Sequence, residues 1–171
     1  MKNKIKNKKI GKGNVLTREN KKINWKVFIF SLLIVYAVAG IGSSFTKIDS
    51  WYESIKPALA PPGWVFGVVW TFLFYLIAIA MYYSWTNSNK KEKKKVFSFY
   101  AVNLILNMLW SFIYFKAKNP AFALVVLIVL WCSILALIIM NWKINKKASY
   151  LLIPYLLWVS FASILNILSI K

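Results

Sequence analysis

Residues 121–142 read AFALVVLIVLWCSILALIIMNW and contain no Lys, Arg, Asp or Glu. An α-helix needs about 20 apolar residues to cross the roughly 30 Å hydrocarbon core of a bilayer. Four more uncharged apolar runs of similar length occur at about 27–45, 64–85, 96–115 and 148–170. A backbone in lipid must satisfy its own hydrogen bonds, and strand-like alternation is absent, so these runs are predicted to be helices. We therefore predict an all-α fold, an integral membrane bundle of five transmembrane helices.

Composition agrees with this fold and argues against several functions. Hydrophobic residues make up 60% of the chain and aromatic residues 18%, and the net charge is +19. The basic residues lie between the apolar runs, which is how orientation signals are arranged, so nucleic acid is not a predicted partner. The chain has no histidine and no carboxylate within an apolar run, so no metal site is predicted and hydrolase or proton-relay chemistry has little support.

The distribution of Lys and Arg predicts how the chain sits in the membrane. Eighteen of them lie on the side of the N-terminus and five on the other side. Because basic residues stay on the cytoplasmic side, we predict a cytoplasmic N-terminus and a C-terminus outside the cell membrane. Residues 1–24 are Lys- and Asn-rich without periodicity and are predicted to be a disordered cytoplasmic tail, which could also bind anionic lipid headgroups. Residues 25–171 form the predicted transmembrane domain.

Aromatic and amide side chains recur at helical spacing on three of the predicted spans. Most membrane tryptophans sit at the interface, but Trp70, Trp110 and Trp158 lie a turn or more inside their spans. Steps of three or four residues place each of the following sets on one helix face: Phe66, Trp70 and Phe74; Asn103, Asn107, Trp110 and Tyr114; Trp158, Ala162 and Asn166. Polar residues at depth face the bundle interior or a cavity. The alternative is that the three amides only bond helix to helix.

Several separated motifs resemble those of the TspO/MBR family, the tryptophan-rich sensory proteins and the mitochondrial translocator protein. They are Trp51-Tyr52, Lys56-Pro57, Pro61-Pro62, Val65-Phe66 and Val69-Trp70-Thr71, then Asn103, Asn107, Trp110-Ser111 and Phe115, then Pro154-Tyr155, Trp158, Phe161-Ala162 and Asn166. The resemblance covers about residues 25–170. It implies a five-helix bundle with a ligand cavity under the first outer loop. Family members bind porphyrins such as protoporphyrin IX and haem, isoquinoline-type drugs and, in mitochondria, cholesterol.

The resemblance also implies which residues form the site. Trp70 and Trp158 match the two tryptophans implicated where bacterial members degrade porphyrin in light. Tyr52 and Pro61 would lie at the cavity mouth, and Phe74, Asn103, Asn107 and Ala162 along its wall. The aromatic stripes add Phe66 and Trp110. Without histidine, haem iron would lack its usual axial ligand, so metal-free porphyrin is easier to accommodate than haem, which stays a second candidate ligand. No cofactor is required.

Three functions follow from this interpretation. The first is a membrane receptor or sensor that holds tetrapyrroles or similar flat hydrophobic ligands between aromatic faces. The alternatives are a light-dependent porphyrin-degrading enzyme that uses Trp70 and Trp158, and a facilitative transporter of porphyrin or sterol-like ligands. Gly63-x-x-x-Gly67 matches a helix-packing spacing and is a weak indication of a homodimer.

Overall fold

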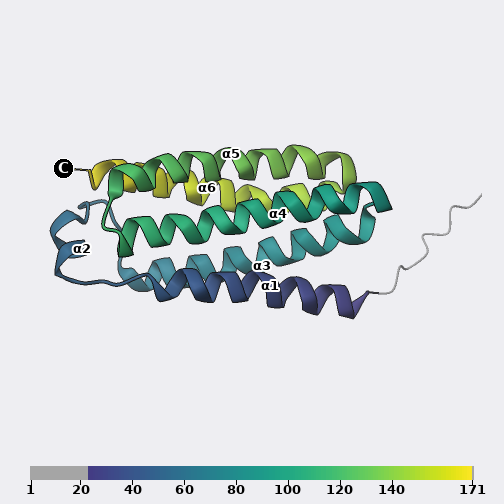
Figure 1. The fold of residues 1–171 in the computed structure, drawn as a ribbon, viewed down its shortest axis with the longest axis horizontal. Coiled ribbons are helices and arrows are strands. Elements are labelled where there is room, and N and C mark those ends of the chain that lie inside the picture. The colour runs from purple at the N-terminus through teal and green to yellow at the C-terminus, as the bar shows by residue number, and fades with distance from the viewer. Residues whose placement is uncertain (1–22, 171) are drawn as a thin grey trace, which may run out of the picture.

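The computed structural model describes residues 23–170, so most of the predicted tail, residues 1–22, lies outside the described part. Within residues 23–170, five helices are long and apolar enough to cross a membrane, as predicted. The elements in order are α1 (Trp25–Ser44), α2 (Ser50–Ile55), α3 (Gly63–Asn87), α4 (Lys90–Ser111), the π-helical turn η1 (Phe112–Lys116), α5 (Pro120–Ile144) and α6 (Lys146–Leu168). Figure 1 shows the long helices side by side, with α2 at one end of the bundle.

Short polar side chains set where the helices begin. Asn24, Asp49, Asn119 and Asn145 each accept a hydrogen bond from a backbone N–H in the first turn of α1, α2, α5 and α6. Asn89 forms a reciprocal capping box with Glu92 at the start of α4. This cap explains why α4 begins six residues before the predicted span, within its lysine-rich segment.

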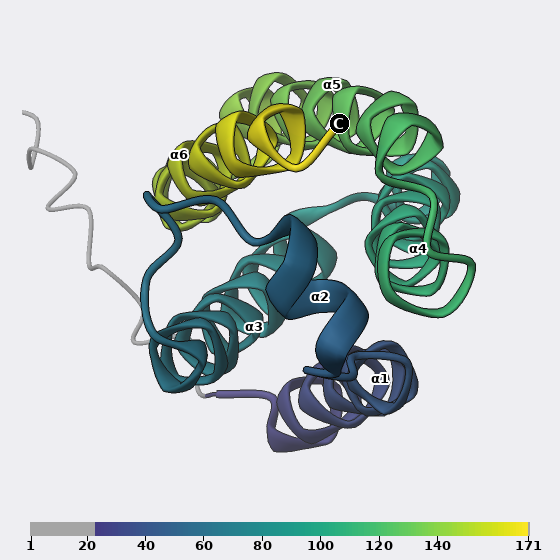
Figure 2. The same cartoon turned by 90° about the vertical axis from the view of Figure 1, so that its left-hand side faces the viewer.

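The helices enclose a space at the α2 end rather than packing around one central helix. α5 packs on α6 and α4, α1 packs on α3 and α4, and α3 packs on α6. Viewed from the α2 end, α2 crosses the middle of the bundle between the other helices (Figure 2). The loop predicted at 46–63 therefore contains a short helix that covers the end of the bundle.

A buried polar network joins three helices in the half of the bundle away from α2. The hydroxyl oxygens of Ser84 and Tyr100 lie 3.0 Å apart, and Asn141 Nδ2 donates to Tyr100 Oη at 3.1 Å. Ser84 Oγ also donates to Asn141 Oδ1 at 2.6 Å. All three residues are fully buried. Because every member has a partner, this network links α3, α4 and α5 without leaving a free polar group.

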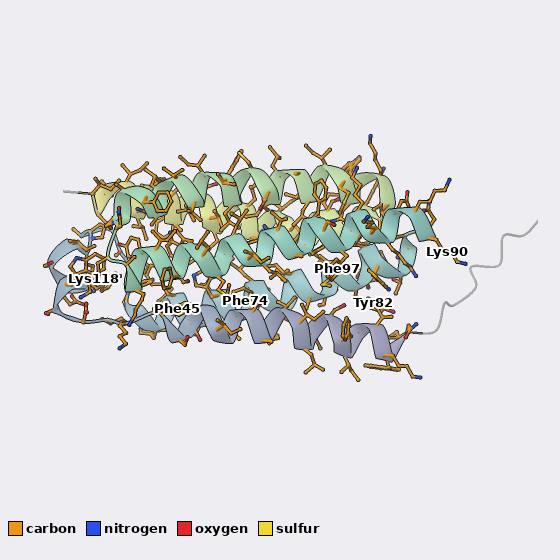
Figure 3. All side chains as sticks on the ribbon, in the orientation of Figure 1. Phe45, Phe74, Tyr82, Lys90, Phe97 and Lys118 are labelled. Carbon is orange, nitrogen blue, oxygen red and sulfur yellow. The ribbon has the colours of Figure 1, made fainter. Side chains whose placement is uncertain are left out.

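Lysines lie over aromatic rings at the same end. Lys93 Nζ is 5.3 Å from the centre of the Trp85 ring, and Lys146 Nζ is 5.4 Å from that of Trp142. Figure 3 shows Lys90 at this end and Lys118 at the other. Cation–aromatic pairs of this kind suit a membrane interface, where the ring contacts lipid and the ammonium contacts water.

Candidate ligand cavity

A cavity of about 470 Å³ lies at the α2 end of the bundle, between α1, α3, α4–η1 and α6. The loop segments on either side of α2 contribute Ile48, Pro57 and Ala60, and α2 itself contributes Tyr52. No Lys, Arg, Asp or Glu occurs among its described lining residues. An apolar cavity of this size with few polar groups has the properties of a small-molecule site.

Most of the predicted site residues line this cavity. They are Tyr52, Phe66, Trp70, Phe74, Asn107, Trp110 and Ala162. Three predicted residues are not among its lining residues: Pro61, Asn103 and Trp158. At the mouth, Pro57 and Ala60 take the position predicted for Pro61. Tyr114 and Phe115 also line the cavity. A four-residue step from Trp110 was the available signal for Tyr114. Phe115 is five residues from Trp110, off that face of a regular α-helix, and it lies in the π-helical turn η1, which the spacing did not predict.

Part of the cavity wall is a row of neighbouring aromatic rings whose planes are inclined to one another by 28° to 34°. Trp70 stacks on Phe74 with centroids 5.4 Å apart and an interplanar angle of 28°. Trp70 and Trp110 are 6.4 Å apart at 31°, and Trp110 and Tyr114 are 5.6 Å apart at 34°. The rings come from α3, α4 and η1 and contact one another as a continuous part of the wall (Phe74 is labelled in Figure 3). The arrangement presents flat π-faces to any occupant.

The polar atoms of the Trp110 and Tyr114 rings form hydrogen bonds to other helices. Trp110 Nε1 donates to Asn166 Oδ1 at 3.1 Å, and Asn166 Nδ2 donates to the Pro120 carbonyl at 2.7 Å. Tyr114 Oη donates to Ser169 Oγ at 2.8 Å. These bonds hold α4 and η1 against α6 and fix the orientation of the two rings.

Only a few polar atoms remain for a ligand. Within the described part of the chain, no hydrogen-bond partner is found for Tyr52 Oη, Trp70 Nε1 or Asn107 Oδ1, and all three residues line the cavity. They offer a hydroxyl, a donor and an acceptor. Burial raises the pKa of the Tyr52 phenol, with smaller contributions from Tyr114 and Glu53, so this hydroxyl is neutral at pH 7.

The buried amides also support the alternative of helix–helix bonding. Asn103 Nδ2 donates to Ser133 Oγ on α5 at 2.8 Å, and Asn107 Nδ2 donates to Tyr155 Oη on α6 at 3.1 Å. Asn103 is fully buried between α4 and α5, whereas Asn107 lies one turn closer to the cavity and lines it. The two amides therefore have different roles, although their spacing places them on one face.

Trp158 lies behind the cavity wall. Its ring packs edge-on against Phe66 with centroids 5.7 Å apart, and Phe66 lines the cavity in front of it. The buried Trp158 Nε1 has no hydrogen-bond partner among the described residues. The family resemblance gives Trp70 and Trp158 a shared role, but only Trp70 lines the cavity and can contact a ligand in it.

α2 closes the cavity at this end of the bundle and is held by contacts from the α4–α5 connection. Asp49 Oδ1 accepts the Tyr52 N–H at 3.0 Å, and Asp49 Oδ2 accepts from Lys118 Nζ at 2.9 Å. The hydrogen bond from Lys118 and then that from the Tyr52 N–H lower the pKa of Asp49 below 3.8. Lys118 Nζ also lies 5.4 Å from the centre of the Trp51 ring. We call residues 50–55 with these contacts the α2 lid.

Gly63 and Gly67 both line the cavity. A Cβ atom at Gly63 would lie 3.0 Å from Ile48 Cδ1, so this glycine permits the loop before α2 to approach α3. A Cβ atom at Gly67 would meet no atom within 4 Å. The spacing that indicated a homodimer is thus placed at the cavity wall, and the homodimer stays a prediction.

The fold and the cavity together define a class of protein: a five-span membrane bundle with an aromatic, uncharged internal cavity. Residues 30–169 match the TspO/MBR family. The chain is 39% identical to the tryptophan-rich protein TspO of Archaeoglobus fulgidus, over 81% of this chain and 91% of that protein. It is 32% identical to the tryptophan-rich sensory protein of Cereibacter sphaeroides (84% and 89% covered) and to the human translocator protein (74% and 78%).

The chain therefore belongs to the TspO/MBR family, as the sequence motifs indicated. Together with the five spans, this membership establishes an integral multi-pass membrane protein.

Proposed function

We propose that the protein is a membrane receptor or sensor that binds a flat tetrapyrrole, such as metal-free protoporphyrin IX, in the cavity under the α2 lid. The observation that carries this proposal is the row of ring faces of Trp70, Phe74 and Trp110, inclined at 28° and 31° to one another, on the wall of a cavity of about 470 Å³. A planar conjugated ligand gains most from such faces, at about 0.5–1.5 kcal/mol per well-placed aromatic pair.

The few free polar atoms suit polar groups at the rim of such a ligand. Trp70 Nε1 and Tyr52 Oη can donate to oxygen atoms there, and Asn107 Oδ1 can accept from a donor there, whereas the inner N–H groups of a porphyrin point into its ring. No charged side chain lines the cavity in the described residues, so the ligand's carboxylates would point toward the mouth, where Lys56 follows α2. Of the two amides predicted along the wall, Asn107 lines the cavity and Asn103 does not.

Two relatives carry names that bear on this proposal, a sensory protein and a translocator protein. Ion-coupled transport is disfavoured, because a coupled carrier needs a charged group at depth and no charged side chain lines the cavity in the described residues. Retention of the ligand under the lid suits a sensor. We also propose the orientation that the basic residues predict, with the Lys90 end of the bundle in the cytoplasm and the α2 lid outside.

Titration with protoporphyrin IX, followed by the porphyrin's own absorbance, tests the binding site. Trp70→Phe removes part of the stacking face and a free donor, so we expect the dissociation constant to rise by about fivefold or more. The matched control is Trp142→Phe, because Trp142 is 46% exposed and lies at the far end of the bundle. Equal dissociation constants for the two variants would contradict the proposed site.

A further inference from the structure

A groove on the membrane-facing side of the bundle shares its wall with the cavity. Tyr36, Gly67, Val68, Thr71, Phe72 and Tyr75 line this groove, between α1 and α3. Tyr36, Gly67 and Thr71 also line the cavity. These three residues therefore form a wall that the cavity and the groove share, which we call the α1–α3 seam.

The seam carries little side-chain bulk next to its hydrogen bond. Tyr36 Oη donates to the Thr71 carbonyl at 3.1 Å. One turn beyond this bond on each helix is a glycine: Gly67 lines both the groove and the cavity, and Gly40 lines the cavity. A Cβ atom at either glycine would meet nothing within 4 Å. Close helix packing would instead press the backbones together, as Gly42 does, where a Cβ atom would lie 3.7 Å from Met108 Cα.

α1 is also the helix least held by the bundle. It buries only Ser31, Val35 and Gly42, whereas α5 and α6 each bury eight residues. At the end away from the lid it is fixed to α3, where the Asn24 N–H donates to Tyr82 Oη at 3.2 Å and Phe28 packs edge-on against the Tyr82 ring. An outward movement of the lid end of α1 would break the Tyr36 hydrogen bond and separate the Phe45 ring from that of Phe112, whose centroids lie 5.3 Å apart.

The aqueous end of the cavity is better closed than the seam. The Asp49–Lys118 ion pair holds the start of the α2 lid, and Tyr52 packs against Phe115 with centroids 5.8 Å apart. Tyr52 is only 9% exposed. A ligand that enters from water must displace the lid, whereas a ligand dissolved in the bilayer must displace only the seam.

We infer that the ligand reaches the cavity laterally from the bilayer, through the α1–α3 seam, with the Tyr36–Thr71 hydrogen bond as its closure. This inference rests on the proposed function and adds to it that the ligand is taken up as a membrane-dissolved molecule. Thr71 Oγ1 donates to the Gly67 carbonyl, so its hydroxyl proton is already engaged within α3. The passage is consequently apolar, as a membrane-dissolved ligand requires.

Stopped-flow binding of protoporphyrin IX to the full chain in lipid nanodiscs tests the seam. Gly40→Leu adds bulk on the cavity side of the seam, so we expect the association and dissociation rates to fall together by at least tenfold, whereas lost cavity space alone would raise the dissociation rate. Ala37→Leu adds the same side chain at an exposed position of α1 that lines neither the groove nor the cavity, and should leave both rates unchanged. Tyr36→Phe adds no atoms and removes the hydrogen bond to the Thr71 carbonyl, so both rates should rise by about fivefold.

Lys118→Met supplies the opposing test, because it releases the α2 lid and leaves the seam intact. Lateral access predicts an unchanged association rate in this variant. The inference is overturned if Lys118→Met raises the association rate while Gly40→Leu and Tyr36→Phe match the unmodified protein. Should Gly40→Leu fail to fold or bind, Tyr36→Phe decides alone. Absence of binding to the unmodified protein would overturn the proposed function itself, and lateral access with it.

Discussion

Removing one hydroxyl group from the buried network tests whether polar bonds between helices stabilise this bundle. In Tyr100→Phe the ring stays and the oxygen is lost. The network balances as a ring in which Tyr100 donates to Ser84, Ser84 donates to Asn141, and Asn141 donates to Tyr100. The substitution removes two of these three bonds. It also leaves Asn141 Nδ2, which is fully buried, without an acceptor.

The expected loss of stability is about 2 kcal/mol. Hydrogen bonds between membrane helices average about 0.6 kcal/mol each, with a maximum near 1.7, so two of them contribute about 1 kcal/mol. An orphaned buried donor adds about 1 kcal/mol or more. The phenylalanine ring fills the same space, so no cavity contribution is expected.

The free energy of unfolding of each variant, measured by denaturant titration in bicelles, provides the assay. Tyr150→Phe is the matched control, because Tyr150 is 54% exposed and no hydrogen bond of its hydroxyl is found in the described residues. It should change stability by less than about 0.5 kcal/mol. Similar losses in the two variants would refute the claim that the network stabilises the fold.

Three further predictions concern the lid and the cavity wall. The pKa of Asp49 is lowered in the folded protein, so its contribution to lid closure is complete above the ordinary carboxyl pKa and is lost as pH falls through the lower folded value. Hydrogen exchange of the α2 amides should therefore become faster as this carboxylate is protonated, and in Lys118→Met the increase should occur at higher pH. Trp110→Phe leaves Asn166 Oδ1 without its donor and should cost about 1 kcal/mol in unfolding free energy; an unchanged melting temperature would contradict it. Gly42→Ala should be tolerated, but Gly42→Leu should destabilise by about 1–3 kcal/mol in the same assay.

The sequence was sufficient to predict the membrane-spanning helices, because the bilayer constrains their length and composition. The length of an apolar run is set by bilayer thickness, so residues 64–85 and 121–142 fall within α3 and α5. Helical spacing likewise grouped Phe66, Trp70 and Phe74, which all line the cavity. These predictions needed only the period of one helix and the thickness of the membrane.

The remaining features depend on how helices are placed relative to one another. Asn103 and Asn107 share a face of α4, but α5 packs beside one and the cavity opens beside the other, which spacing cannot reveal. α2 is only six residues long, and its main signal was Asp49 as a cap before Ser50. Helical spacing and the family motif both placed Trp158 at the site, yet it does not line the cavity, and its ring packs edge-on against Phe66, which does.

The hydrogen bonds that hold Trp110 and Tyr114 to α6 have a consequence for selectivity. Because both rings are fixed before any ligand arrives, little conformational entropy is lost on binding, and the free energy of stacking is retained. The same rigidity keeps this part of the cavity wall in one shape. The cavity is therefore expected to favour planar conjugated compounds, which can lie against this wall, over puckered or reduced macrocycles of the same composition.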